Sequence, residues 1–254
     1  MAKVLTTGQA GAPDLTPNPA FPTARLVERR DLTEDLMVIK LEPSEPFNFK
    51  PGQYCTLGLG KIERAYSIAS APYEKYLEIF VELVPEGELT PRMWELKIGD
   101  CMSVRPKAKG LFTMDRKMHH HYMLATVTGV APSISIVRQY LHDGDEGHVF
   151  YIMYGASYAD ELTYDVEFNE LAERYPDTVK FVPTVSRPTE ARNSGWQGAT
   201  GRVNTIAEEY LEKFDLPKDD TKVYACGHPG MIEDVKEKVV SKGWNFIEER
   251  FWKP

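Results

Sequence analysis

The chain has 254 residues, of which 42% are hydrophobic and 27% are charged, and this is the composition of an ordinary globular protein. Its formal net charge of −8 argues against general nucleic-acid binding, and no apolar run approaches the roughly 20 residues that cross a bilayer. The three cysteines, Cys55, Cys101 and Cys226, are too few and too scattered for a disulfide framework, a zinc site or a four-cysteine cluster. We therefore expect a cytoplasmic protein with no metal site and no membrane span.

The first half of the chain predicts a β domain. Residues 1–20 are rich in Pro, Gly and Thr and are expected to form a flexible tail. Residues 21–116 contain short β-like runs separated by Pro and Gly, at 24–32, 36–43, 52–59, 64–70, 76–84 and 101–106. Six short strands without a long helical pattern favour an antiparallel six-stranded β-barrel. One short helix is expected near residue 90, with Thr90 as its cap and Pro91 at its first position.

The second half, residues 117–254, alternates between strands and helices. The expected strands cover residues 122–129, 148–157, 179–186, 221–227 and 245–252, and the expected helices cover 131–144, 159–176, 202–214 and 229–243. This alternation predicts βαβ units and an α/β doubly wound parallel sheet. Ligands of such sheets bind beyond the carboxyl ends of the strands, so the turns there are the places to inspect.

The run RAYSIAS, Arg64 to Ser70, places a cation, a phenol ring and two hydroxyls within one predicted strand. Such residues suit an exposed strand face, where aromatic side chains pair across strands. They also suit a ligand that needs a positive charge, a flat apolar surface and a hydroxyl close together. The run alone leaves both interpretations open.

Two strand-to-helix turns in the second half carry candidate binding residues. The turn ATVTGVAPSIS contains Gly129, which permits close backbone approach, and Pro132, which suits an early helical position. Taken alone it fits tight-turn geometry and pyrophosphate binding equally well. The turn CGHPGM begins with Cys226, which suits contact with a flat cofactor ring better than covalent catalysis because no His/Asp partner pattern accompanies it.

The third strand of this half ends in TVSRP, which supplies Ser186 and Arg187, and GATGR adds Arg202. A hydroxyl beside two guanidinium groups is the set needed to bind a phosphate monoester, which favours a nucleotide 2′-phosphate. The terminal aromatic residues Phe251 and Trp252 indicate burial, against either protein or a planar ligand.

A basic segment, Arg105 to His121, carries five Lys/Arg residues against one Asp. It is either a solvated edge or a docking surface for an acidic protein. The triplet His119, His120 and His121 at its end is not a metal site, because neighbouring residues of a strand point to opposite faces and no carboxylate or cysteine completes a ligand set.

Together these motifs resemble the ferredoxin–NADP⁺ reductase superfamily, particularly its compact bacterial ferredoxin/flavodoxin reductases, from about Thr23 to the last residue. RAYS is similar to the family's Arg-x-Tyr-Ser flavin motif. The resemblance implies that Arg64 neutralises the FAD pyrophosphate, Tyr66 packs against the isoalloxazine, and Ser67 hydrogen-bonds near flavin N5. The segment PEGELT resembles the second FAD segment, which assigns FAD contacts to Glu88, Leu89 and Thr90.

The second half carries the matching nucleotide motifs. ATVTGVAP resembles the family's Gly-Thr-Gly-hydrophobic-Ala-Pro turn with Val127 in place of the first Gly, which leaves Thr128 and Gly129 as dinucleotide contacts. CGHP resembles the turn that places Cys226 beside the nicotinamide, and RFW resembles terminal aromatics that cover the flavin or its adenine. Ser157 stands where related bacterial reductases can carry an Arg toward the 2′-phosphate. Glu248 or Glu249 is a candidate for proton handling.

The resemblance thus implies a flavoprotein oxidoreductase with tightly bound, non-covalent FAD. It takes a hydride from NADPH, with NADH possible, and passes single electrons to or from a small acidic ferredoxin or flavodoxin. An NADH-using reductase component of an oxygenase and a redox-silent nucleotide-binding regulator are the alternatives. Ser67 and Cys226 are the expected catalytic residues. The expected cofactor contacts are Arg64, Ala65, Tyr66, Ser67, Glu88, Leu89, Thr90, Thr128, Gly129, Ser186, Arg187, Arg202, Cys226, Gly227, His228, Pro229, Met231, Phe251 and Trp252.

Overall fold

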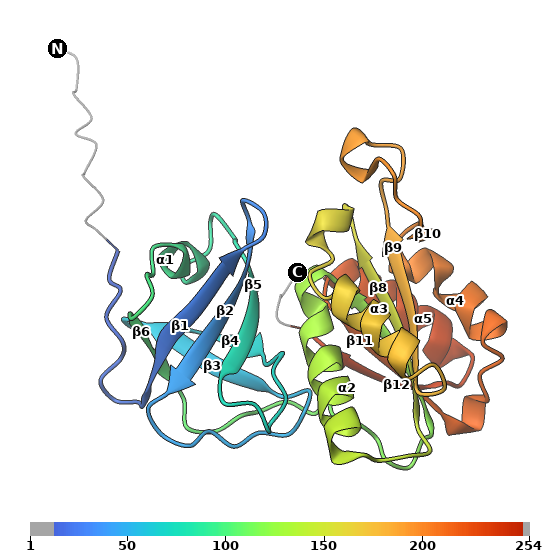
Figure 1. The fold of residues 1–254 in the computed structure, drawn as a ribbon, viewed down its shortest axis with the longest axis horizontal. Helices are drawn as coiled ribbons and strands as arrows, with labels where there is room; N and C mark the ends of the chain where they lie inside the picture. The colour runs from blue at the N-terminus through green and yellow to red at the C-terminus, as the bar shows by residue number, and fades with distance from the viewer. Residues whose placement is uncertain (1–12, 251–254) are drawn as a thin grey trace.

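The computed structural model describes residues 13–250 and shows two domains side by side (Figure 1). The first contains a six-stranded sheet and the second contains another, with helices on both of its faces. The expected combination of an antiparallel β domain and a doubly wound parallel sheet is therefore confirmed.

The N-terminal sheet is antiparallel, with strand order β4-β3-β6-β1-β2-β5. Its elements are β1 (Thr23–Asp31), β2 (Leu36–Pro43), β3 (Tyr54–Leu59), β4 (Ile62–Ser67), β5 (Leu77–Glu82), the helix α1 (Thr90–Trp94) and β6 (Cys101–Val104). The edges of the sheet meet where Ile68, directly after β4, bridges Ile79 of β5. The sheet is thus curled into a barrel around an apolar core.

One local expectation for this domain is wrong. Leu89 occupies the cap position of α1, and Thr90 is the first helical residue. The Thr90 hydroxyl is instead bonded to the backbone N–H and carbonyl of Val84, so it fastens the preceding loop to the helix. Residues 13–20 of the expected tail lie against the barrel, because Gly60 N–H donates to the Thr16 carbonyl at 2.6 Å and Arg92 donates to the Asp14 carbonyl at 2.9 Å. Residues 1–12 of that tail lie outside the described residues.

The C-terminal sheet is parallel, with strand order β10-β9-β8-β7-β11-β12. Its strands are β7 (His120–Thr126), β8 (Val149–Ala156), β9 (Val179–Val185), β10 (Ala199–Thr200), β11 (Thr221–Cys226) and β12 (Asn245–Glu249). Its α-helices are α2 (Ala131–Asp143), α3 (Asp165–Arg174), α4 (Val203–Lys213) and α5 (Pro229–Ser241). Residues of α2 and α3 pack with Met123 on one face, and residues of α4 and α5 pack with Leu124 on the other. From β7 the chain runs outward through β8, β9 and β10 and then returns to place β11 on the other side of β7. The strand order therefore switches between β7 and β11, and doubly wound sheets bind nucleotides at such a switch point.

The expected helix over residues 159–176 is shorter than predicted. It is divided into a 3-10 turn, η2 (Ala159–Glu161), and α3. The Glu161 carboxylate accepts hydrogen bonds from the backbone N–H groups of Ser157 and Tyr158, at 3.0 and 3.1 Å, and so closes the turn as a separate unit. The last strand ends at Glu249 in the structure, and the predicted roles of Phe251 and Trp252 fall outside the described residues.

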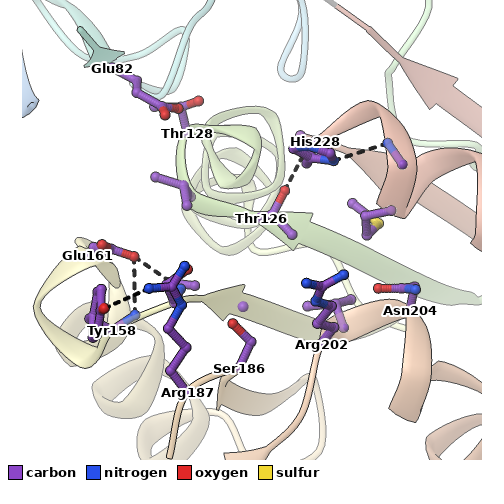
Figure 2. A pocket seen from close by; sticks show the side chains of 18 of the residues that line it. Glu82, Thr126, Thr128, Tyr158, Glu161, Ser186, Arg187, Arg202, Asn204 and His228 are labelled. Carbon is purple, nitrogen blue, oxygen red and sulfur yellow. Dashed lines mark hydrogen bonds between the residues drawn. The ribbon is translucent and has the colours of Figure 1, made fainter. Parts of the chain in front are cut away.

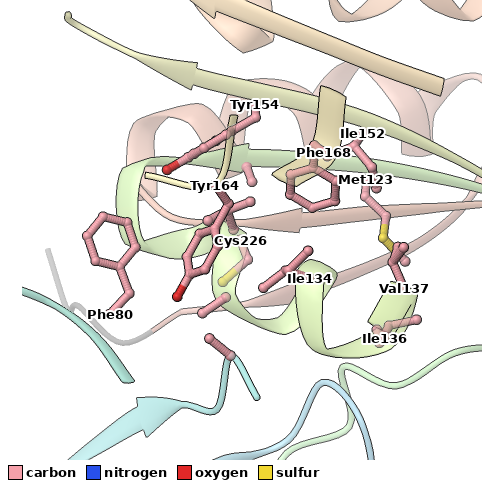
Figure 3. Packing of buried hydrophobic residues seen from close by; sticks show 14 of the residues in the cluster. Phe80, Met123, Ile134, Ile136, Val137, Ile152, Tyr154, Tyr164, Phe168 and Cys226 are labelled. Atoms are coloured by element: carbon pink, nitrogen blue, oxygen red, sulfur yellow. The ribbon is translucent and has the colours of Figure 1, made fainter. Parts of the chain in front are cut away.

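A shared core joins the two domains (Figure 3). Phe80 of β5 packs edge-on against Tyr164, with ring centroids 5.9 Å apart, and both belong to the apolar cluster around α2. Ser135 of α2 donates a 2.7 Å hydrogen bond to the Ser70 carbonyl. Because apolar and polar contacts both cross the boundary, the barrel and the parallel sheet are held in one relative arrangement.

Candidate functional site

A small cavity of about 220 Å³ lies between the barrel and the switch point of the parallel sheet. The barrel contributes the sequence-predicted residues Arg64, Ala65, Tyr66, Ser67, Glu88, Leu89 and Thr90. The parallel sheet contributes the sequence-predicted residues Thr128, Gly129, Cys226 and Gly227. Segments that are more than 150 residues apart in the chain thus form one lining.

The Ser67 hydroxyl is the polar group of this cavity that most clearly needs a ligand. Ser67 is 8% exposed, and its Oγ is buried with no hydrogen-bond partner in the structure. A buried hydroxyl without a partner costs roughly 1–3 kcal/mol, so a ligand atom that accepts or donates there gains that free energy on binding. Tyr66, the neighbouring ring, packs on the barrel core and also lines the cavity. The pair suits a planar ligand with a polar edge.

Arg64 supplies a positive charge at the mouth of the same cavity. Its guanidinium forms an ion pair with Glu88, and both side chains are more than half exposed. An exposed pair of this kind contributes at most about 1 kcal/mol, so an anionic group can take the place of Glu88 at little cost. Hydroxyl, ring and cation fit the chemistry of a flavin nucleotide, and the residues present therefore suit FAD.

The floor of the site is formed by two turns in close contact. A Cβ atom on Gly129 would lie 2.2 Å from the Cys226 carbonyl oxygen, so only glycine permits this approach. Gly227 has a φ of +128° and would place a Cβ 2.2 Å from Thr126 Oγ1. The His228 N–H also donates to Thr126 Oγ1 at 2.8 Å. The carboxyl ends of β7 and β11 are thereby locked together.

A larger cavity of about 990 Å³ continues from this floor along the edge of the parallel sheet (Figure 2). It contains the sequence-predicted residues Thr128, Ser186, Arg187, Arg202, Gly227, His228, Pro229 and Met231. The two cavities share Glu82, Thr128 and Gly227, so they form one continuous cleft. Figure 2 shows Arg187 and Arg202 on the side of this cavity away from Glu82 and Thr128. The cleft therefore has an aromatic, hydroxyl-bearing end and a cationic end.

Two ionisable groups near the small cavity are held neutral by burial. Cys226 is 1% exposed, and burial raises the pKa of its thiol well above the ordinary value, which disfavours a thiolate nucleophile. Burial likewise raises the pKa of Glu249 to about 8, and its Oε2 has no hydrogen-bond partner. Glu249 pairs in register with Cys226 across β11 and β12. A protonated carboxyl group thus lies one strand away from the floor of the site.

Comparison with known proteins identifies the family to which the chain belongs. Residues 23–112 match the model of an oxidoreductase FAD-binding domain, and residues 123–237 match that of an oxidoreductase NAD-binding domain. The chain is 32% identical over 225 residues to the flavodoxin/ferredoxin–NADP reductase of Escherichia coli (strain K12), an alignment that covers 84% of this chain and 88% of that one. The chain belongs to the ferredoxin–NADP⁺ reductase family.

A second relative of this family member is the ferredoxin–NADP reductase of Pseudomonas aeruginosa, 32% identical over 234 residues that cover 87% of this chain and 90% of that one. The crystal structure of a ferredoxin NADP⁺ reductase from Neisseria gonorrhoeae with bound FAD and NADP shares the fold, with a TM-score of 0.80 at 23% identity, covering 92% of this chain and all of that one. This family member is thus an oxidoreductase with an FAD-binding and an NAD(P)-binding domain. Among its described residues, none of the helices has the length and apolar character needed to cross a membrane.

Several residues of the cleft were not singled out from the sequence. Glu82 lies in a predicted strand and carries no local signal, yet it faces both cavities, where burial and the nearby Asp35 raise its pKa. Thr126 lies in the turn ATVTGVAPSIS, but its structural role depends on its contact with the distant Gly227. The other residues that sequence reasoning missed include Tyr158, Glu161, Arg192, Val203 and Asn204.

Proposed function

We propose that this family member transfers a hydride from NADPH to FAD and passes single electrons between the flavin and a ferredoxin or flavodoxin. One observation carries the proposal: the cavity that suits the flavin and the cavity that suits the dinucleotide meet at Thr128 and Gly227. The flavin, when bound, supplies the conversion between two-electron and one-electron chemistry. The protein supplies binding, alignment and control of protons.

The residues of the small cavity divide this work between them. Ser67 would offer its unpartnered hydroxyl to the polar edge of the isoalloxazine, and Arg64 would hold the pyrophosphate in place of Glu88. Cys226 lines the cavity with a neutral thiol, so it would border the nicotinamide ring without adding charge. Glu249 holds a proton near neutral pH behind Cys226. Hydride transfer then depends on how the nicotinamide ring is aligned with the flavin, and a misplacement of about 1 Å slows it strongly.

The cationic end of the cleft favours NADPH over NADH. Ser186, Arg187 and Arg202 line the large cavity, and a hydroxyl with two guanidinium groups matches the oxygens of a 2′-phosphate. An NADH-using reductase component of an oxygenase or other complex is the second candidate. It is favoured by the ion pair between Arg187 and Glu190, because a carboxylate at that end suits a ribose 2′-hydroxyl.

A surface next to the flavin end fits a small acidic partner in a cytoplasmic setting. In the loop between β6 and β7, the exposed residues Lys107 and Lys109 precede Leu111, which is 85% exposed. A Cβ on Gly110 in the same loop would lie 2.8 Å from Glu249 Oε1, which places the loop beside the site. Arg105 and Arg116 of the same segment are already paired with Glu63 and Asp145. Two exposed lysines and an exposed apolar residue in the same loop are the expected contact for an acidic ferredoxin or flavodoxin.

Rapid-mixing reduction of the FAD-loaded protein tests the reaction. Mixing with NADPH should bleach the flavin absorbance, and Ser67→Ala should slow the bleaching about 100-fold, because a donor aimed at the reacting edge is lost. Ser241→Ala, on α5, is the matched control and should leave the rate unchanged. A purified protein that binds no flavin, or one that NADPH and NADH both fail to reduce, contradicts the proposal.

The partner surface is tested on the same holoenzyme. Lys107→Glu combined with Lys109→Glu should weaken electron transfer to an acidic ferredoxin and flatten its dependence on salt, while reduction by NADPH continues. Lys213→Glu on α4 changes the same kind of charge away from this loop and serves as the control. If the double lysine variant and the Lys213→Glu control transfer electrons at equal rates, the partner binds to another surface.

A further inference from the structure

Tyr158, in the turn after β8, lies close to two arginines at the cationic end of the large cavity. The Arg192 Cζ lies 4.2 Å from the centroid of the Tyr158 ring, and the Arg187 Cζ lies 5.4 Å from it. All three side chains line the cavity. A guanidinium that stacks on a ring keeps its N–H groups at the edge of the stack, where they can donate to a third partner. Tyr158 thus holds the guanidinium groups of Arg187 and Arg192 close to the same ring at the cationic end of the cavity.

Arg192 is held in this place by the backbone around it. It belongs to a 3-10 turn, η3 (Ala191–Asn193), whose last residue, Asn193, is only 3% exposed. The Asn193 amide donates to the carbonyls of Ser157 at 3.0 Å and Arg187 at 2.9 Å, and its oxygen accepts from the Ala159 N–H at 2.8 Å. The turn carrying Arg192 is therefore fastened to the ends of β8 and β9, the two strands that border the cavity.

The Glu190 carboxylate shows which kind of acceptor suits the Tyr158 hydroxyl and the Arg187 guanidinium. The Tyr158 hydroxyl donates to Glu190 and accepts from Arg187 Nη1 at 2.8 Å, and Arg187 lies 3.6 Å from Glu190. Carboxylates and phosphates present similar oxygens to guanidinium groups, and a phosphate dianion carries the larger charge. A phosphate monoester can therefore replace Glu190 as the acceptor beside Tyr158. Arg192 is in turn bonded to Asp160 at 2.9 Å and lies 3.5 Å from the Glu161 carboxylate. The bond to Asp160 is an exposed pair that is weak enough to rearrange.

We propose that Arg192 is a specificity-determining residue for NADPH: it binds the 2′-phosphate together with Arg187, Asn193 positions it, and Glu190 competes with the phosphate. The inference deepens the proposed function and depends on it for the identity of the nucleotide. Ser157 stands where related bacterial reductases can carry an Arg toward the 2′-phosphate, and it provides no cation. The Ser157 carbonyl is instead the anchor for Asn193, so the turn after β9 delivers a cation to the same region.

Binding of adenosine 2′,5′-bisphosphate and of 5′-AMP to the FAD holoenzyme, measured by calorimetry, tests the inference. Arg192→Gln should weaken the bisphosphate roughly 10-fold to 100-fold, the effect of losing a hydrogen bond to a charged group, and should change 5′-AMP binding less than about 2-fold. Glu190→Gln should tighten the bisphosphate. Arg174→Gln is the matched control, because Arg174 also stacks on a tyrosine, Tyr175, with its Cζ 5.3 Å from the ring, on α3 rather than in the cavity.

Kinetics and pH separate a binding role from a structural one. Arg192→Gln should raise the KM for NADPH by the same factor as the bisphosphate loss and leave NADH-driven reduction unchanged. Its effect should shrink below about pH 6, where the phosphate becomes a monoanion. Arg192→Lys, which keeps the charge, should retain part of the affinity and serves if the glutamine variant does not fold. Equal losses for NADPH and NADH, or a glutamine variant that matches Arg174→Gln, overturn the inference. A flavin that neither nucleotide reduces would refute the proposed function instead, while the bisphosphate comparison still reports on Arg192.

Discussion

Replacing Arg138 with leucine removes the cation that joins the two domains. Arg138 lies on α2 with its side chain 13% exposed, and its Nη1 donates at 3.1 Å both to Glu78 of β5 and to the Ala69 carbonyl. Its other nitrogens donate to the Glu167 carboxylate at 2.7 Å. Burial opposes the charge of Arg138, but the bonds to Glu167 and the attraction of Glu78 outweigh it, so its pKa is raised. The guanidinium is therefore permanently charged and bonded to both domains.

The size of the loss follows from what the variant leaves behind. Glu78 is 8% exposed, and in Arg138→Leu its carboxylate keeps only the hydroxyl of Tyr164, at 2.9 Å, among these partners. Leaving one member of a buried ion pair unpaired costs about 3–5 kcal/mol. The exposed pair of Arg25 and Glu42 provides the comparison, because its loss in Arg25→Leu costs at most about 1 kcal/mol.

Urea unfolding followed by circular dichroism measures both variants. The free energy of unfolding should fall by about 3–5 kcal/mol for Arg138→Leu and by less than about 1 kcal/mol for Arg25→Leu. Adding Glu78→Gln to Arg138→Leu should recover part of the loss, because the unpaired charge is removed. Equal losses for the two arginine variants, or no recovery in the double variant, would refute the assignment of this cluster as the joint.

Two further predictions concern groups that burial keeps neutral. The pKa of Glu249 is raised to about 8 from its usual 4.5, so the folded state holds the proton more tightly and stability is lost as pH rises between these values. The urea midpoint of Glu249→Gln should therefore be higher than that of the wild type at pH 8 and equal to it at pH 4. Equal midpoints at both pH values would contradict a buried, protonated Glu249. Burial also raises the pKa of Cys55, to about 12, and that of Cys226, so only the half-buried Cys101 should react quickly with a thiol-specific disulfide reagent. A second fast thiol, or a fast phase that persists in Cys101→Ser, would contradict this burial.

The features that the sequence predicted are those set by local pattern. Alternating strand and helix periods predicted the parallel sheet, because a buried strand such as β7 needs residues of both faces to be apolar. The turn at Gly129 was identifiable because close backbone approach requires glycine. The same locality explains the error at Thr90, whose hydroxyl suits a helix cap but is bonded to Val84 six residues earlier.

The features that the sequence did not predict depend on contacts between distant segments. Arg138 reads as an ordinary residue of an amphipathic helix, and only the docking of the barrel brings Glu78 within its reach. Arg192 reads as one charge in a polar loop, and its position depends on where the Asn193 amide finds its partners. Neither arrangement follows from spacing, because each needs the relative position of two elements that the chain does not connect directly.

Val127 shows how the fold can hold a residue that local preference disfavours. Its φ is +44°, in the left-handed region, which costs a non-glycine residue roughly 1–2 kcal/mol and is least suited to a β-branched side chain. The turn is fixed on both sides, by the His228 N–H bonded to Thr126 and by Gly129 against the Cys226 carbonyl. Such strain persists only where the surroundings determine the backbone. The valine therefore keeps a conformation that glycine adopts freely, and its side chain gains packing against the apolar cluster beneath. The change from the glycine implied by the resemblance thus leaves the turn between the two cavities in place.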